Sequence, residues 1–126
     1  MTYRRSLVAL AGLALATAAC VPGDSPSVSC SDPEVTIATT LANDQLDPAN
    51  LDACRDQHVV INVTVEQDGT LHLHGFPEQV DEEEVTAGTP LTIEFDAVRS
   101  GQFPIELHAA GGADEVEVGT LTVREP

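Results

Sequence analysis

Two histidines that stand one residue apart form the strongest chemical feature of the sequence. They lie in TLHLHGF at residues 70–76, where His72 and His74 flank Leu73. In a β-strand, alternate side chains share one face and lie about 7 Å apart, so both imidazoles would point the same way. Two imidazoles on one face can chelate a single copper or zinc ion. The same spacing is also typical of a solvated surface strand, so the pattern alone leaves both interpretations open.

From residue 58 onward, the chain around these histidines alternates between apolar and polar residues. In HVVINVTVE, which begins at residue 58, every second residue from Val59 to Val65 is apolar. Turn-forming segments such as QDG and AGGAD separate such runs. Short alternating strands at this spacing predict an all-β fold, an antiparallel β-sandwich. The alternation recurs in PLTIEFDA at 90–97, QFPIELHA at 102–109 and VEVGTLTVRE at 116–125.

Other segments give weaker structural signals. VTIATTLA at 35–42 alternates weakly and indicates a first strand. Asp47 as an N-cap and Pro48 at the first helical position predict a short helical turn in LDPANLDAC. Pro104 cannot donate a backbone hydrogen bond, so we expect its strand to lie at an edge or to be bulged there. The acidic run DEEE at 81–84 is interpreted as a solvated loop.

The connection before the histidines decides which face they occupy. A two-residue DG hairpin would place Val65 opposite His72, on the face of the valines. A three-residue QDG loop would pair Leu71 with Val65 and His72 with Thr64, which fits the hydrophobic pattern. A third possibility is that the chain crosses from one sheet to the other at this point.

The N-terminus has the layout of a secretory signal. Arg4 and Arg5 precede the apolar stretch LVALAGLALA, which is too short to span a membrane. Small residues before Cys20 resemble the bacterial lipobox, in which the cysteine becomes the lipidated first residue of the mature protein. Thr17 stands where leucine is commoner, which leaves an ordinary cleaved signal as the alternative.

The lipobox resemblance implies a division of the chain into three parts. We expect a signal peptide at 1–19, then the lipidated cysteine with a flexible tether rich in proline and serine at 20–33. One domain at 34–126 would follow. The mature protein would then sit in the cell envelope, at the outer face of the cytoplasmic membrane, and contact the membrane through its lipid anchor only.

With Cys20 assigned to the lipid, one pair of cysteines remains, Cys30 and Cys54. In an oxidising exported setting, this pair predicts a disulfide, which stabilises the fold by about 3 kcal/mol on the loop-entropy estimate. A thiolate metal site is the alternative, although the spacing matches no zinc pattern.

The acidic composition limits the classes of molecule that the protein can bind. The chain carries 21 Asp and Glu residues against five Lys and Arg residues, for a formal net charge of -16. Such a chain is repelled by nucleic-acid phosphates and anionic headgroups, which excludes nucleic acid and an anionic lipid surface as partners. A metal ion or a basic protein would be attracted. We expect a monomeric domain.

Several motifs together resemble the C-terminal half of cupredoxin-like domains in exported bacterial proteins. LHLHGF is followed by VTAGTPLTIEFDAVRSGQFPIELH and then by GTLTV. In that family, H-x-H-G-[YF] precedes an A-G-x-P turn and a G-x-F-x-[IV]-E-L strand. The resemblance covers about residues 58–126. It implies a Greek-key, cupredoxin-like β-sandwich with copper as the metal.

The ligands of a blue-copper centre are nevertheless missing. Leu107 stands where the family has its cysteine, no cysteine follows Cys54, and Met1 is the only methionine. A blue-copper electron-transfer site needs that thiolate, so this function is excluded. A site of nitrogen and carboxylate ligands remains, made of His72, His74 and His108, with Glu106 on the same strand face as His108. We interpret His58 as structural or exposed.

Enzymatic functions are not expected. Superoxide dismutases and multicopper oxidases need more histidines than the four in this chain, and no hydrolytic triad is recognisable. Two functions remain open. One is an exported lipoprotein that binds or handles a metal ion, copper being favoured, through its histidines. The other is a metal-free β-sandwich interaction module whose acidic surface meets a basic protein partner.

Overall fold

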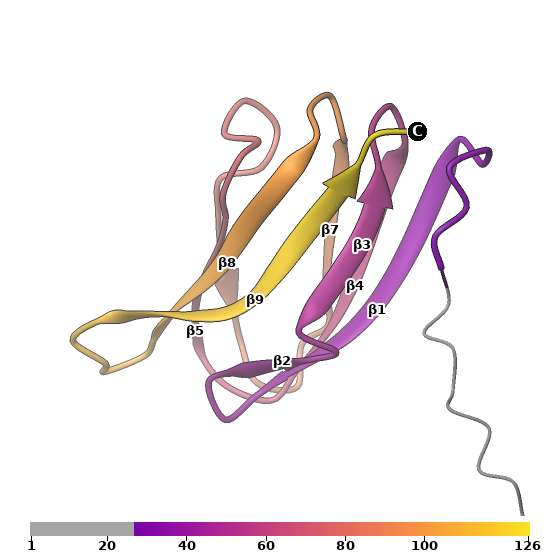
Figure 1. Cartoon of the computed structure of the whole chain (residues 1–126). Coiled ribbons are helices and arrows are strands. Elements are labelled where there is room, and N and C mark those ends of the chain that lie inside the picture. The colour runs from indigo at the N-terminus through magenta and orange to yellow at the C-terminus, as the bar shows by residue number, and fades with distance from the viewer. Residues whose placement is uncertain (1–26) are drawn as a thin grey trace, which may run out of the picture.

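The computed structural model describes residues 27–126, so the expected signal peptide, Cys20 and the first part of the tether lie outside the described residues. This part of the chain forms two facing β-sheets (Figure 1). Among the described residues, no helix is long and apolar enough to cross a membrane. The strands are β1 (Glu34–Ala42), β2 (Gln45–Asp47), β3 (Asn50–Cys54), β4 (His58–Val65), β5 (Gly69–Leu73), β6 (Glu82–Val85), β7 (Leu91–Asp96), β8 (Gly101–Ala109) and β9 (Glu115–Arg124).

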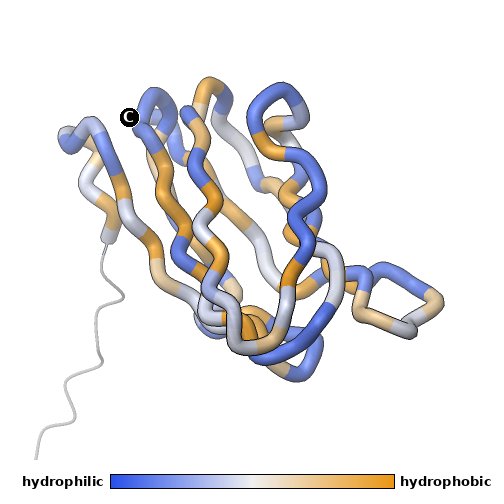
Figure 2. Tube along the Cα trace, turned by 180° about the vertical axis from the view of Figure 1, so that it is seen from behind, coloured by the Kyte–Doolittle hydropathy of each residue, from blue (hydrophilic) through white to orange (hydrophobic). Residues whose placement is uncertain are grey.

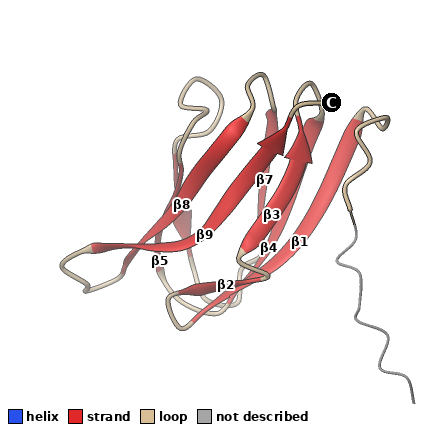
Figure 3. Cartoon of the chain, viewed as in Figure 1, coloured by secondary structure: helices blue, strands red, loops and turns tan. Residues whose placement is uncertain are grey.

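The strands form one four-stranded and one five-stranded sheet. Their orders are β2-β1-β4-β7 and β3-β9-β8-β5-β6. The described chain consists of strands and loops (Figure 3), which confirms the all-β sandwich predicted from the sequence. The sheets are mixed, because β1 pairs with β4 and β3 with β9 in parallel, whereas the other pairs are antiparallel. Period-two alternation gives a strand's faces but not the direction of its neighbour, so the parallel pairs were not predicted.

The core lies between the sheets and consists of the inward residues of the alternating strands. Hydrophobic positions recur along the strands in Figure 2, and those from Val59 to Val65 are buried as predicted. Val116 is an exception and remains 40% exposed. The hairpin between β8 and β9 extends beyond the rest of the sandwich (Figure 1), and a bulge between Ile105 and Glu106 shifts its register. Val116 lies near the tip of this hairpin, where its side chain is partly open to solvent.

The connection from β4 to β5 crosses between the sheets, which was the third possibility left open by the sequence. The strand β4 pairs with β1 and β7, whereas β5 lies between β8 and β6 in the other sheet. Leu71 is opposite Leu107 and buried, and His72 is opposite Glu106 on the outer face. Both hairpin registers are therefore wrong.

Three local predictions need correction or refinement. The helical turn expected at Asp47 and Pro48 is absent from the described residues, because β3 pairs with β9 and this tertiary contact overrides the local capping signal. The run DEEE is mostly strand rather than loop, since Glu82 begins β6. Pro104 lies in a central strand and not at an edge, but the expected bulge follows directly after Ile105.

The disulfide predicted between Cys30 and Cys54 is confirmed, with a Cα–Cα distance of 5.4 Å. Beside it, the buried Gln57 donates from Nε2 to the backbone oxygens of Ser29 and Asp32, each at 2.9 Å. Its Oε1 accepts from the Cys54 amide at 2.8 Å. Residues 29–32, expected to belong to the flexible tether, are therefore held against the sandwich.

Candidate metal site

His72, His74 and Glu106 form the one group in the described chain with at least three potential metal-ligating side chains close together. One ligand atom from each lies within 4.8 Å of the others. His74 Nε2 is 2.8 Å from Glu106 Oε2. The two imidazole rings meet edge to face, with centroids 6.1 Å apart. The chelating arrangement expected from H-x-H is therefore present on the outer face of the five-stranded sheet.

His72 is surrounded by further carboxylates. Its Nε2 lies 2.7 Å from Glu82 Oε1, and its Nδ1 lies 3.1 Å from Glu115 Oε1. The Glu82 oxygen is close but poorly aligned, and the buried Nε2 atom has no hydrogen-bond partner of good geometry. A buried ring nitrogen without such a partner is unusual in a folded protein. It offers a lone pair to a cation in the neutral tautomer protonated at Nδ1.

The neighbours of β5 explain why these groups meet. Residues directly opposite each other in paired strands share a face, and their Cβ atoms lie about 5 Å apart. His72 faces Glu82 on β6 and Glu106 on β8. Glu115 and Glu117 follow on β9, opposite His108 and Glu106. The sheet thus brings carboxylates from three strands to one face.

The segment HGF fixes the end of this strand. Gly75 has a φ of 99°, and a Cβ atom there would overlap the ring of Phe103. Phe76 is fully buried and packs between Phe95 and Phe103, with ring centroids 4.7 and 4.9 Å away. His74 donates its backbone N–H to Pro104 O at 3.1 Å. Glycine and phenylalanine therefore position the imidazole that precedes them.

Arg99 holds the loop that follows the histidines. Its Nη1 donates to Gly75 O at 2.7 Å, and its guanidinium lies 5.7 Å from the centre of the Phe76 ring. Gln79 exchanges two hydrogen bonds with the backbone of Asp96, at 2.8 and 3.0 Å. These contacts anchor the site to the loop after β7.

The structure separates the two other histidines from this group. His108 lies on the same outer face as Glu106, opposite Thr70 and Glu115, and is not part of the close group. His58 lies on the other sheet, where its Nδ1 is 2.9 Å from Asp96 Oδ1. This hydrogen bond, together with the charges of Asp96, Glu34 and Glu94, raises the pKa of His58 above its ordinary value of 6.5 against an opposing effect of burial.

Sequence reasoning missed Glu82 and Glu115 as neighbours of His72. The signal was present, because Glu82 and Glu84 alternate with Glu83 and Val85 in period two. Glu115 and Glu117 likewise alternate with Val116 and Val118. The first run is interpreted above as a loop, and the second is used only for its hydrophobic residues.

The donor set fits a borderline divalent cation. Imidazole nitrogens and carboxylate oxygens suit Cu(II) and Zn(II), whereas Cu(I) prefers thiolates and thioethers. Among residues 27–126, both cysteines are in the disulfide, so no thiolate is available there. The described residues can therefore bind a metal ion through nitrogen and oxygen but cannot build a blue-copper centre.

Comparison with known proteins identifies the fold. No protein-family model and no curated protein matches the sequence. Among solved structures, a multicopper oxidase from Pseudomonas thermotolerans matches with a TM-score of 0.54 and 17% identity, covering 73% of this chain and 30% of that one. A blue copper oxidase from Nitrosomonas europaea matches with a TM-score of 0.57 and 15% identity, covering 73% and 39%. A copper binding protein solved in its apo form matches with a TM-score of 0.55 and 11% identity, covering 74% and 90%.

These similarities define a class of fold. The described domain is a cupredoxin-like β-sandwich, as the sequence motifs implied. It spans 39% or less of the two oxidase chains, so it corresponds to one part of those larger proteins.

Proposed function

We propose that this protein is an exported, membrane-anchored metal-handling lipoprotein that binds Cu(II) through His72 and His74, with Glu106 as the carboxylate ligand. The observation that carries the proposal is the close group of three ligand atoms, one side chain of which has a buried nitrogen without an aligned partner. When bound, the ion would supply a cationic centre in an otherwise acidic face. We favour copper over zinc as the ion because solved structures of similar fold include copper proteins.

The surrounding residues have separate roles in this proposal. Glu115, beside His72 Nδ1, accepts a hydrogen bond from the N–H of that nitrogen, which keeps the proton on Nδ1 and leaves the Nε2 lone pair free to coordinate. Glu82 lies within reach of the same Nε2 and is the candidate for a fourth ligand. The negative charge of the face attracts a cation at long range. The protein binds and delivers or buffers copper, and we expect it to have no enzymatic activity of its own.

Calorimetric titration of the purified protein with Cu(II) tests the proposal. The parent protein should bind one equivalent, and binding should weaken on acidification because protons compete for the imidazole nitrogens. The double variant His72→Ala/His74→Ala should lose this equivalent. The matched control is His58→Ala/His108→Ala, which also removes two imidazoles and should bind as the parent does. Equal binding by both double variants would refute the proposal.

The anchoring part of the proposal rests on the sequence around Cys20 and needs its own test. Mass spectrometry of the protein extracted from membranes should find a diacylated or triacylated cysteine at residue 20 as the first residue. Cys20→Ala should release the protein from the membrane fraction. A mature chain that begins elsewhere, or a Cys20→Ala variant that remains in the membrane, would contradict anchoring but would leave metal binding untouched.

A further inference from the structure

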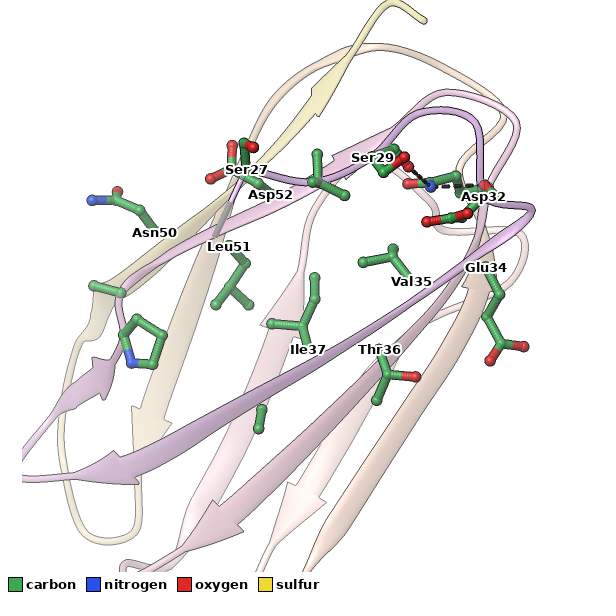
Figure 4. Close-up of a pocket in the computed structure, with 15 residues that line it drawn as sticks. Ser27, Ser29, Asp32, Glu34, Val35, Thr36, Ile37, Asn50, Leu51 and Asp52 are labelled. Carbon is green, nitrogen blue, oxygen red and sulfur yellow. Dashed lines mark hydrogen bonds between the residues drawn. The ribbon is translucent and has the colours of Figure 1, made fainter. Parts of the chain in front are cut away.

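A groove opens on the side of the sandwich away from the metal site, between β1 and β3. It has a volume of about 540 Å³, and its lining includes Val35, Ile37 and Leu51 together with residues 27–29 and Pro48. Figure 4 shows the side chains of Val35, Ile37 and Leu51 in the space between the two strands. Val35 and Ile37 are half-buried and pack on the core. The groove therefore exposes an apolar floor between the two sheets.

Specific contacts hold the chain segments at the two ends of the groove. At one end, Thr39 Oγ1 donates to Pro48 O at 2.9 Å and joins β1 to the segment before β3. At the other end, the disulfide holds Cys30, and Gln57 donates hydrogen bonds to Ser29 O and Asp32 O, which Figure 4 marks with dashed lines. The walls between these contacts are thus held at a fixed separation.

One wall presents an unpaired strand edge. In a strand, the backbone groups of alternate residues point to opposite sides. Pro33 O and Leu41 O accept hydrogen bonds from the β4 side, from His58 N and Glu66 N, each at 2.9 Å. The backbone N–H and C=O groups of Glu34, Thr36 and Ala38 therefore point away from β4, toward the groove. In the described chain β2 pairs with β1 only from Thr40 to Ala42, so these three residues have no strand partner on that side.

The opposite wall presents a second unpaired edge. Ala49 O accepts from Thr120 N, and Arg55 N donates to Arg124 O, both at 2.8 Å, which places the odd-numbered residues of this strand toward β9. The backbone N–H and C=O groups of Asn50 and Asp52 consequently point away from β9, toward the groove. No further strand of the described chain pairs with them, because β3 is the last strand of its sheet. An extended peptide in the groove could therefore form a backbone ladder and cover the apolar floor with every second side chain.

Charge decides which peptide fits. Three carboxylates line the groove, those of Asp32, Glu34 and Asp52. Asp52 Oδ1 already accepts a hydrogen bond from Arg124 Nη2 at 2.8 Å, so a guanidinium is accommodated at this rim. A second copy of this chain would bring another net charge of -16 to the same place. We propose that the groove binds an extended segment of a partner protein that alternates basic and apolar residues, and that it does so by β-strand addition.

A model peptide tests this proposal. The probe is a heptapeptide of alternating lysine and valine with blocked ends, added to the purified protein while backbone amide NMR shifts are followed. Saturable binding with shifts concentrated at Thr36, Ala38 and Asp52 is expected. A peptide with glutamate in place of lysine should not bind. Absence of saturable binding by the lysine peptide overturns the proposal.

Two proline variants test the strand edge. Thr36→Pro removes a donor that points into the groove and should weaken peptide binding about tenfold, because it also places a ring on the edge. Thr92→Pro is the matched control on β7, which forms the other edge of the same sheet. The backbone groups of its even-numbered residues also point outward, since Asp96 N donates to the Gln79 side chain and not to β4. It should leave binding unchanged. Equal weakening by both variants would overturn strand addition.

Two charge reversals keep the test decisive if Thr36→Pro fails to fold. Glu34→Lys lies in the groove and Glu94→Lys lies on β7, and both change the net charge by the same amount. Weaker binding in Glu34→Lys alone supports a local site, whereas equal weakening shows attraction to the whole acidic surface and overturns the proposal. A dimer detected by sedimentation and lost in Glu34→Lys would overturn it in favour of a second copy.

Discussion

His58 and His72 both lie beside carboxylates, but on different sheets and with different neighbours. The imidazole of His58 forms an ion pair with Asp96 at 2.9 Å, and the next residue on the same strand face is Val60. His72 has Glu82 and Glu115 on its two nitrogens and His74 two residues further along the strand. The difference teaches that one histidine beside a carboxylate accounts for an ion pair, whereas a second imidazole at the next position on the same face supplies the further ligand that the proposed chelate needs.

The difference between the two sites is tested most directly by adding a second imidazole beside His58. Val60→His would place an imidazole on the outer face of β4, opposite Glu94, while His58 stays opposite Asp96. This reproduces the H-x-H and carboxylate pattern of the candidate metal site, so a second Cu(II) equivalent should appear in calorimetry. Val60→Asn is the control and should add none. No added equivalent in Val60→His would mean that spacing and carboxylates are insufficient for the chelate.

The packing under the candidate metal site is tested by Gly75→Ala. The added methyl group overlaps the Phe103 ring, and φ at this position is 99°, so we expect a loss of about 2–4 kcal/mol in unfolding free energy with weaker Cu(II) binding. Gly88→Ala isolates the backbone contribution, because its φ is 84° and nothing lies within 4 Å. Denaturant unfolding should give it the smaller loss, about 1 kcal/mol. Equal losses would argue against the packing role of Gly75.

The carboxylates around His72 provide a finer test. Glu82→Gln/Glu115→Gln should weaken Cu(II) binding about tenfold, because partners of a metal-binding histidine tune its orientation and basicity. Glu34→Gln/Glu94→Gln removes the same charge around His58 and should leave the affinity unchanged. Competition titration against a chelator measures both. Similar weakening in both pairs would assign the effect to the overall negative charge.

The smallest effect concerns His58 itself. The pKa of folded His58 is raised above 6.5, chiefly by the Asp96 hydrogen bond, so protonated His58 stabilises the native state. This contribution is fully present below pH 6.5 and is lost as the pH rises through the raised pKa. Unfolding free energies of the parent and of His58→Gln should therefore converge as the pH rises through this range. A difference that stays constant or grows with pH would contradict the assignment.

The strands that carry the candidate metal site could be predicted because apolar residues on one face alternate with polar residues on the other. Leu71 and Leu73 face the core, so His72 and His74 had to share the outer face once β5 was recognised as a strand. The family motifs then indicated the cupredoxin-like fold. Glu106 was predicted by its place on the strand of His108.

The remaining features depend on contacts between distant segments. Glu82 and Glu115 reach His72 only because β6 and β9 join the same sheet as β5, a pairing order that alternation does not encode. Asp47 and Pro48 carry a valid helix-start signal that is overridden when β3 pairs with β9. His108 shares the outer face as predicted, but its place opposite Thr70 keeps it outside the close group.

Electron paramagnetic resonance of the protein loaded with one equivalent of Cu(II) tests the central claim most directly. Coordination by His72, His74 and Glu106 predicts a tetragonal signal with couplings from two imidazole nitrogens. The visible absorption spectrum of the same sample should lack the intense sulfur-to-copper charge-transfer band of a blue site. The signal should be lost in His72→Ala/His74→Ala and retained in His58→Ala/His108→Ala. A signal that survives in the first double variant, or that loses a nitrogen coupling in the second, would contradict the account.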